Sequence, residues 1–110
     1  MTELATGFRT LDPSDAIPND FVVPYYLADR KLRVAVARVD DQLFAFDDLC
    51  TCADQTCALS GGLLAGMTVM CQCHGSEFDI STGVVRTGPA TRPLAVYEVR
   101  EQDGQIQVRA

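Results

Sequence analysis

Alternating hydrophobic and polar positions predict β-strands along most of this chain. From Lys31 to Val39 the side chains alternate, so that leucine and valine share one face of a strand and arginine and alanine share the other. Asp40-Asp41 supplies a turn, and residues 42–46 continue as the return strand of a hairpin. Phe21 to Ala28 is a further β-rich segment between polar pairs.

The end of the chain predicts a second hairpin. Ala95–Arg100 and Gln105–Arg109 flank Asp103-Gly104, which is a strong signal for a tight turn. The last strand is expected to turn its apolar side chains inward and its polar side chains outward: Ile106 and Val108 against Gln105, Gln107 and Arg109. No long segment keeps a helical period, so we expect one all-β domain of short strands over residues 1–110.

Residues 47–93 do not alternate cleanly and are rich in Gly, Cys, Ser, Thr and Pro, which is typical of loops on a rigid scaffold. Within them, Leu63–Met70 is expected to form a short hairpin. All 5 cysteines lie between Cys50 and Cys73, and His74 is the 1 histidine of the chain. We therefore expect the function to reside in this region.

The formal charge of −6 argues against binding to nucleic acid, which requires a basic face. The first residues show neither a basic nor an apolar segment of a signal peptide. The uncharged segment from Gln55 to Ser76 contains glycine, serine and glutamine, a composition unsuited to a membrane span. We expect a soluble, cytoplasmic protein.

In such a protein, clustered cysteines indicate a metal site more readily than a disulfide framework. Cys50 and Cys52 are two residues apart and can face one site, and a tight turn can bring Cys71 and His74 together, with Gly75 relieving the crowding. Sulfur with imidazole favours zinc or iron–sulfur chemistry over magnesium or calcium. The spacing alone leaves both possibilities open.

Further motifs resemble a known family. Residues 71–79 (CQCHGSEFD), 81–83 (STG) and 88–90 (GPA) resemble the second cluster loop and proline loop of Rieske-type [2Fe–2S] proteins. Residues 50–51 fall where that family begins its first cluster loop, and residues 58–62 resemble the segment between the loops. The resemblance covers nearly the whole chain. It implies antiparallel sheets with two loops at one end that bind a [2Fe–2S] cluster.

The first loop departs from the family, which has Cys-x-His there and Cys-x-x-His in the second loop. The resemblance assigns Cys50 and Cys71 to the inner iron and His74 to the outer iron, with Cys52 as the fourth ligand if its shorter side chain reaches. A third thiolate makes the cluster more negative. We expect the potential to fall from the roughly −150 to +300 mV of two-histidine centres toward the roughly −400 mV of plant-type clusters, with one redox-linked ionisation, at His74.

The resemblance also implies roles for neighbouring residues. Cys57 and Cys73 occupy positions that carry a disulfide in the high-potential branch, although two reduced thiols are the alternative in a cytoplasmic protein. Ser76 resembles the serine that donates a hydrogen bond to a bridging sulfide. Phe78 stands where the highest-potential members have tyrosine and is also suited to core packing. The same two loops contain Gly75 and Pro89.

The resemblance implies a monomeric, ferredoxin-like one-electron carrier that catalyses no substrate chemistry. A flavin-dependent reductase would be the donor, an oxygenase or another oxidase the acceptor, and His74 the exit for the electron. Acidic side chains near the loops either steer a basic partner or only aid solubility: Asp47, Asp48, Asp54 and Glu77.

Three alternatives stay open. Cys50, Cys52, Cys71 and His74 could form a structural zinc site. The fold could serve a non-catalytic small subunit with an altered or absent cluster. The cysteine at position 52 could also be an engineered change of ligand.

Overall fold

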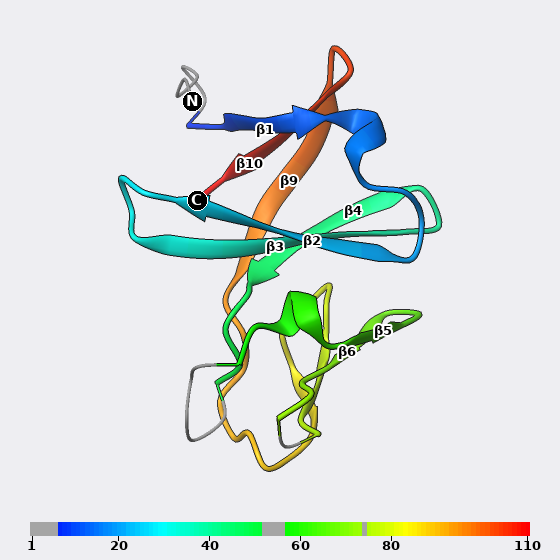
Figure 1. Cartoon of the computed structure of the whole chain (residues 1–110), viewed down its shortest axis with the longest axis vertical. Coiled ribbons are helices and arrows are strands. Elements are labelled where there is room, and N and C mark those ends of the chain that lie inside the picture. Colours follow the sequence, from blue (N-terminus) through cyan, green and yellow to red (C-terminus); the bar gives the residue numbers. More distant parts are fainter. Residues whose placement is uncertain (1–6, 52–56, 74) are drawn as a thin grey trace.

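The computed structural model describes residues 7–51, 57–73 and 75–110. Its elements in chain order are β1 (Arg9–Pro13), the 3-10 helix η1 (Ser14–Ala16), β2 (Phe21–Leu27), β3 (Leu32–Val39), β4 (Gln42–Asp47), the 3-10 helix η2 (Leu59–Gly61), β5 (Leu63–Ala65), β6 (Thr68–Met70), β7 (Glu77–Asp79), β8 (Val85–Thr87), β9 (Val96–Gln102) and β10 (Gln105–Arg109). A larger sheet has the strand order β1-β10-β9-β4-β3-β2, and a smaller sheet has the order β5-β6-β7-β8 (Figure 1). Neighbouring strands are antiparallel throughout, which confirms the all-β prediction.

Two hairpins of the larger sheet turn as the sequence predicts. Between β3 and β4, Asp40 and Asp41 have φ of 52° and 64°. Between β9 and β10, Asp103 and Gly104 have φ of 55° and 73°. Positive φ at both central residues matches the twist of the flanking strands, and Asp and Gly tolerate it better than most residues. Local turn chemistry therefore sets the register of both hairpins.

Strand β3 is buried on both faces, and each face contributes to a different core. Val34 and Val36 pack in a core formed by the larger sheet. Ala35 and Ala37, which point the other way, pack in a second core with side chains of the smaller sheet. The short alanine side chains leave room for the smaller sheet to pack closely against β3, so this strand joins the two halves of the molecule.

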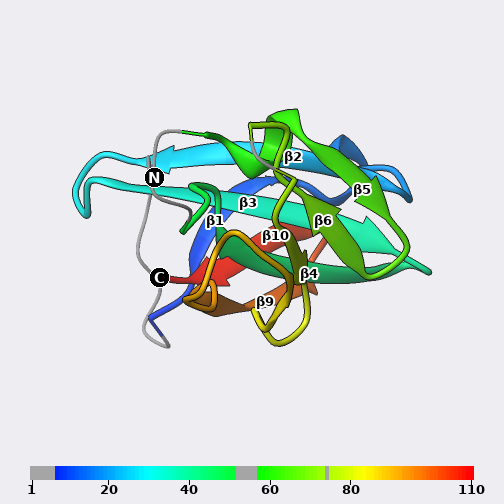
Figure 2. The ribbon, with the colours of Figure 1, turned by 90° about the horizontal axis from the view of Figure 1, so that it is seen from below.

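Strands β4 and β9 carry the chain toward the smaller sheet. They pair at Phe46 and Val96, and the Asp47 N–H donates to the Ala95 carbonyl at 2.9 Å. The segments that follow β4 and precede β9 therefore leave the larger sheet side by side (Figure 1). Figure 2 shows the molecule from below, with the loops of this end nearest the viewer. This end of the molecule contains the cysteine-rich loops.

Two expectations about the strands were incomplete. The sequence pattern did not predict β1, which has an irregular register at residues 10–12, or the three-residue strands β7 and β8. The Leu63–Met70 hairpin is confirmed as β5 and β6. In β10, Ile106 and Val108 are buried as expected. The expectation that Gln107 faces outward is wrong, since it is also buried, and its side chain accepts a hydrogen bond from Arg100 Nε at 2.8 Å. Among the described residues, no helix is long and apolar enough to cross a membrane.

Candidate metal centre

The first loop of the candidate centre leaves β4 and is closed at its base by backbone contacts. Leu49 and Ala58 form an isolated antiparallel bridge, and the Cys50 N–H donates to the Cys57 carbonyl at 2.9 Å. Cys50 is buried at this position. The two strands of the loop are thereby fixed to each other where Cys50 enters the core. Cys52 lies outside the described residues.

A buried carboxylate braces the base of this loop. Asp48 is 0% exposed, and its oxygens accept hydrogen bonds from Arg33 Nε at 2.5 Å, Ser60 N–H at 2.7 Å and Ser60 Oγ at 3.0 Å. Partner steering and solubility both require an exposed carboxylate, so both interpretations are wrong for Asp48, which is paired with Arg33 and enclosed by η2. Asp54 lies outside the described residues.

The second loop begins where β6 ends and makes a tight turn between Cys71 and Ser76. The Cys71 N–H donates to the Ser76 carbonyl at 2.8 Å, and the Gly75 N–H donates to the Cys71 carbonyl at 3.0 Å. Gly75 has a φ of 78°, in the left-handed region that glycine adopts readily, and open space surrounds the position of a Cβ atom. The expectation that Gly75 relieves crowding is therefore wrong, and the glycine serves the left-handed backbone conformation instead. Cys71 is 0% exposed, and His74 lies outside the described residues.

A third segment, the proline loop of residues 88–93, connects to both cysteine loops. The Ala90 N–H donates to Ser76 Oγ at 3.0 Å, within a buried environment. Thr51 Oγ1 donates to the Arg92 carbonyl at 2.5 Å. The loop contains a cis peptide bond between Gly88 and Pro89. Ser76 and Pro89 thus lie in adjoining loops, as the resemblance implies, and the hydroxyl of Ser76 links them.

Two glycines permit close backbone contacts around these loops. A Cβ atom at Gly62 would overlap the carbonyl oxygen of Met70, the residue before Cys71. A Cβ atom at Gly83 would overlap the carbonyl oxygen of Leu94, whose N–H donates to the Gly83 carbonyl at 2.8 Å. Glycine at position 62 therefore lets the chain lie directly against the backbone of Met70, and glycine at position 83 does the same against the backbone of Leu94.

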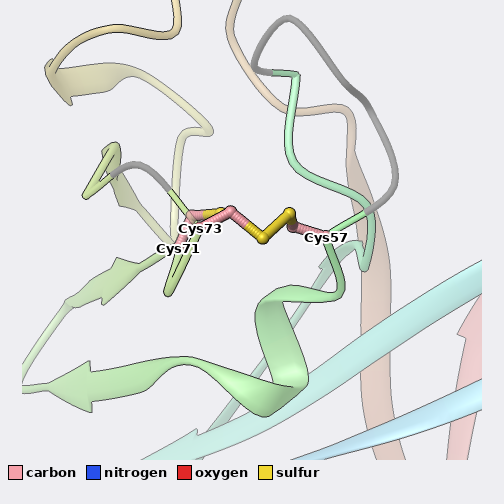
Figure 3. Close-up of side chains that lie close together, drawn as sticks. All are labelled: Cys57, Cys71 and Cys73. Carbon is pink, nitrogen blue, oxygen red and sulfur yellow. A yellow bond between two sulfur atoms is a disulfide. The ribbon is translucent and has the colours of Figure 1, made fainter.

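Three sulfur atoms lie close together between the two cysteine loops (Figure 3). Cys57 and Cys73 are joined in a disulfide with a Cα–Cα distance of 6.3 Å, which is the pairing that the resemblance implied. The Sγ atoms of Cys57, Cys71 and Cys73, here called the sulfur triplet, all lie within 4.8 Å of one another. The disulfide therefore joins the first loop to the second directly beside Cys71.

A groove runs beside the first loop, and its chemistry is mixed. The residues that line it are Asp47, Leu49, Cys50, Thr51, Arg92, Pro93 and Ala95. Burial raises the pKa of Asp47 above its ordinary value, a hydrogen bond from the Leu49 N–H opposes this, and the charge of Asp48 adds to it. Of the acidic residues near the loops that the structure describes, Asp47 and Glu77 are half-buried and Asp48 is buried, so none of these three is fully exposed.

The structure brings together most of the described residues that the sequence singled out. Cys50, Cys71 and Phe78 share one hydrophobic core, so Phe78 is a packing residue at 0% exposure. Sequence reasoning missed the bracing of Asp48 by Arg33 and Ser60. The available signal was that Asp48 lies two positions before the candidate ligand Cys50, but its partners Arg33 and Ser60 lie 15 and 12 residues away in the sequence.

Comparison with known proteins gives a consistent result. Residues 8–98 match the model of the Rieske [2Fe-2S] domain. Ferredoxin CarAc of Metapseudomonas resinovorans is 40% identical over 75 residues, covering 68% of each chain. The anthranilate 1,2-dioxygenase ferredoxin subunit of Burkholderia cepacia has the same identity and coverage.

Solved structures agree with this result. The Sphingomonas yanoikuyae B1 ferredoxin has a TM-score of 0.83 and 27% identity, over 93% of this chain and 97% of that one. A chain in the complex of reduced oxygenase and oxidized ferredoxin in carbazole 1,9a-dioxygenase has a TM-score of 0.84 and 29% identity, over 93% and 92% of the two chains. With two buried cysteines on facing loops and a family model that matches most of its length, the chain belongs to the Rieske [2Fe–2S] domain family.

Proposed function

We propose that this chain is a one-electron carrier that accepts an electron from a flavin-dependent reductase and passes it to an oxygenase or a comparable acceptor. The observation that carries the proposal is the burial of Cys50 and Cys71 on two loops joined by a disulfide, at one end of a rigid all-β scaffold. The named ferredoxin components among its relatives support this role. The chain would act as a single-domain, cytoplasmic monomer and not as an enzyme.

The described donor set fits a [2Fe–2S] cluster. Thiolate sulfur is the ligand that iron–sulfur clusters require, and both cysteines lie in a core that excludes water. Cys50 and Cys71 would bind the inner iron, and Cys52 and His74 would complete the outer iron. When bound, the cluster supplies a reversible one-electron change, which this chain's own side chains do not provide.

The protein contributes geometry and a dry environment. Backbone hydrogen bonds at Cys50 and Cys71 fix where each thiolate enters the core. Ser76 Oγ accepts the Ala90 N–H, so its own proton is directed away from that bond and is suited to donate to a bridging sulfide. The proline loop closes over this hydroxyl. Together these contacts would hold the cluster at the loop end, where a partner can approach.

Metal analysis of freshly purified, anaerobically handled protein tests the proposal. We expect two irons and two acid-labile sulfides per chain, a coloured oxidised state, and an electron paramagnetic resonance signal after one-electron reduction. Stopped-flow mixing with a flavin-dependent reductase and then with an oxygenase should show reduction followed by reoxidation. Colourless, iron-free protein would contradict the proposal and favour a non-catalytic subunit, and stoichiometric zinc would favour a structural metal site.

A further inference from the structure

The sulfur triplet allows a second chemistry beside the cluster loops. Cys57 and Cys73 are bonded to each other, and the Cys71 sulfur lies within 4.8 Å of both (Figure 3). We propose that reduction of the Cys57–Cys73 disulfide opens a three-thiolate binding site for a soft divalent cation such as Zn²⁺ or Cd²⁺, formed by Cys57, Cys71 and Cys73. The disulfide keeps this site closed.

The closed state follows from the chemistry of sulfur. The thiolate is the metal ligand, and a sulfur in a disulfide carries no such charge. A two-electron reductant of the dithiol or phosphine class breaks the Cys57–Cys73 bond, and two protons complete the two thiols. A dithiol is oxidised to its own disulfide, and a phosphine takes the oxygen of a water molecule. Binding of the cation then releases the protons that its three sulfur ligands still carry.

The backbone positions suit such a site. Tetrahedral coordination with Zn–S bonds of about 2.3 Å places sulfur atoms about 3.8 Å apart. The triplet already lies within 4.8 Å, and the Cα atoms of Cys57 and Cys73 are 6.3 Å apart. Side-chain rotation after reduction can therefore separate the two bonded sulfurs by the required distance without moving the loops.

The surroundings give a reductant and a cation a route to the site. Cys73 is exposed and Cys57 is half-buried, whereas Cys71 is 0% exposed. The triplet therefore spans the boundary between solvent and core. A reductant meets Cys73 first, and a cation entering from that side finds Cys71 as its innermost ligand.

Sharing of Cys71 has a consequence for the cluster, and this step rests on the proposed function. One thiolate cannot complete the inner iron and a three-thiolate site at the same time. Binding of a soft cation would therefore displace the cluster, and the intact disulfide protects the cluster from this competition. The three-thiolate site itself requires no cluster.

The test uses the full-length, cluster-loaded protein with Cd²⁺ alone as the probe, with and without a water-soluble phosphine. Native mass spectrometry counts iron and cadmium, and the ¹¹³Cd chemical shift reports how many sulfur atoms bind the ion. We expect one Cd²⁺ per chain and loss of iron only after reduction. The apparent affinity for Cd²⁺ should rise more than about 100-fold on reduction, since 100-fold is the largest effect expected from a residue that only supports a metal ligand.

Two variants control the assignment. The double variant Cys57→Ser, Cys73→Ser keeps only Cys71 of the triplet and should not take up Cd²⁺ at wild-type affinity, with its fold checked by amide NMR. Cys50→Ser removes a buried cysteine outside the triplet and should still take up Cd²⁺ only after reduction, even though it lacks a cluster ligand.

Equal uptake without the phosphine, wild-type uptake by the double variant, or loss of uptake in Cys50→Ser would each overturn the three-thiolate site. Cadmium bound to chains that retain their iron would overturn the sharing of Cys71. If the wild-type protein never carries iron but Cys50→Ser behaves as expected, the proposed function fails and the metal site stands.

Discussion

Substitution of Ser76 by alanine separates the structural and electronic roles of one hydroxyl. Ser76 is 0% exposed and Ala90 is 4% exposed, and the Ala90 N–H donates to Ser76 Oγ at 3.0 Å. Removing the oxygen leaves that N–H buried without this acceptor. It also removes the proton that the family resemblance directs to a bridging sulfide.

Each role predicts a magnitude. A buried N–H left unsatisfied costs about 1–3 kcal/mol of folding free energy, and alanine adds no new bulk. A neutral hydrogen bond that stabilises the reduced cluster contributes about 1 kcal/mol. Since a tenfold change in a one-electron equilibrium corresponds to about 59 mV, loss of this bond should lower the potential by about 40 mV.

Voltammetry and urea unfolding followed by circular dichroism measure the two effects on the same samples. Ser81→Ala is a matched control, because Ser81 is exposed and its Oγ donates to Asp79 Oδ1 at 2.5 Å in the turn between β7 and β8. We expect a stability loss in both variants and a lower potential only in Ser76→Ala. An unchanged potential in Ser76→Ala, or an equal shift in Ser81→Ala, would refute the reasoning.

Three further predictions follow from the fold and the ligand set. Gly83→Ala and Gly104→Ala both place a side chain at positive φ, which costs about 1–2 kcal/mol. Of the two, only the new Cβ atom at position 83 overlaps backbone, so the urea midpoint of Gly83→Ala should fall further than that of Gly104→Ala. Hydrogen bonds from Ser81 and, second in size, from Arg86 lower the pKa of Asp79. The ionised Asp79 therefore stabilises the fold above the ordinary carboxyl pKa, and this stabilisation is lost as pH falls. Arg86→Gln removes one of these partners and should move acid unfolding, followed by circular dichroism, to higher pH. Cys52→His should raise the potential and add a second redox-linked ionisation in pH-dependent voltammetry, because a neutral imidazole replaces a charged thiolate.

The sequence predicted the features that depend on neighbouring residues. The turns at residues 40–41 and 103–104 require positive φ, and the Asp and Gly residues at these positions indicate this from the local sequence alone. The tight turn after Cys71 was likewise readable from Gly75, whose φ of 78° follows from its place in the loop. The all-β class follows from the alternation in the long strands.

Features that depend on distant partners could not be predicted in this way. The burial of Asp48 requires Arg33 from β3 and Ser60 from η2, and no local pattern records that they meet. Strand β7 has only three residues, too few to show a period, and it is stabilised by pairing with β6 and β8. In both cases the tertiary structure, and not the segment, supplies the stabilising contacts.

The described contacts that brace the first loop are separate from the side chain at position 52, where the predicted fourth ligand is a cysteine. The base of the first loop is fixed by the Leu49–Ala58 bridge, the Cys50 amide and the buried Asp48 carboxylate. None of these contacts uses the side chain at position 52. If Cys52 binds the outer iron as predicted, its thiolate adds negative charge next to the cluster while the braced base keeps its shape. We therefore expect a change between cysteine and histidine at this position to alter the electrostatics of the centre and to leave its support intact.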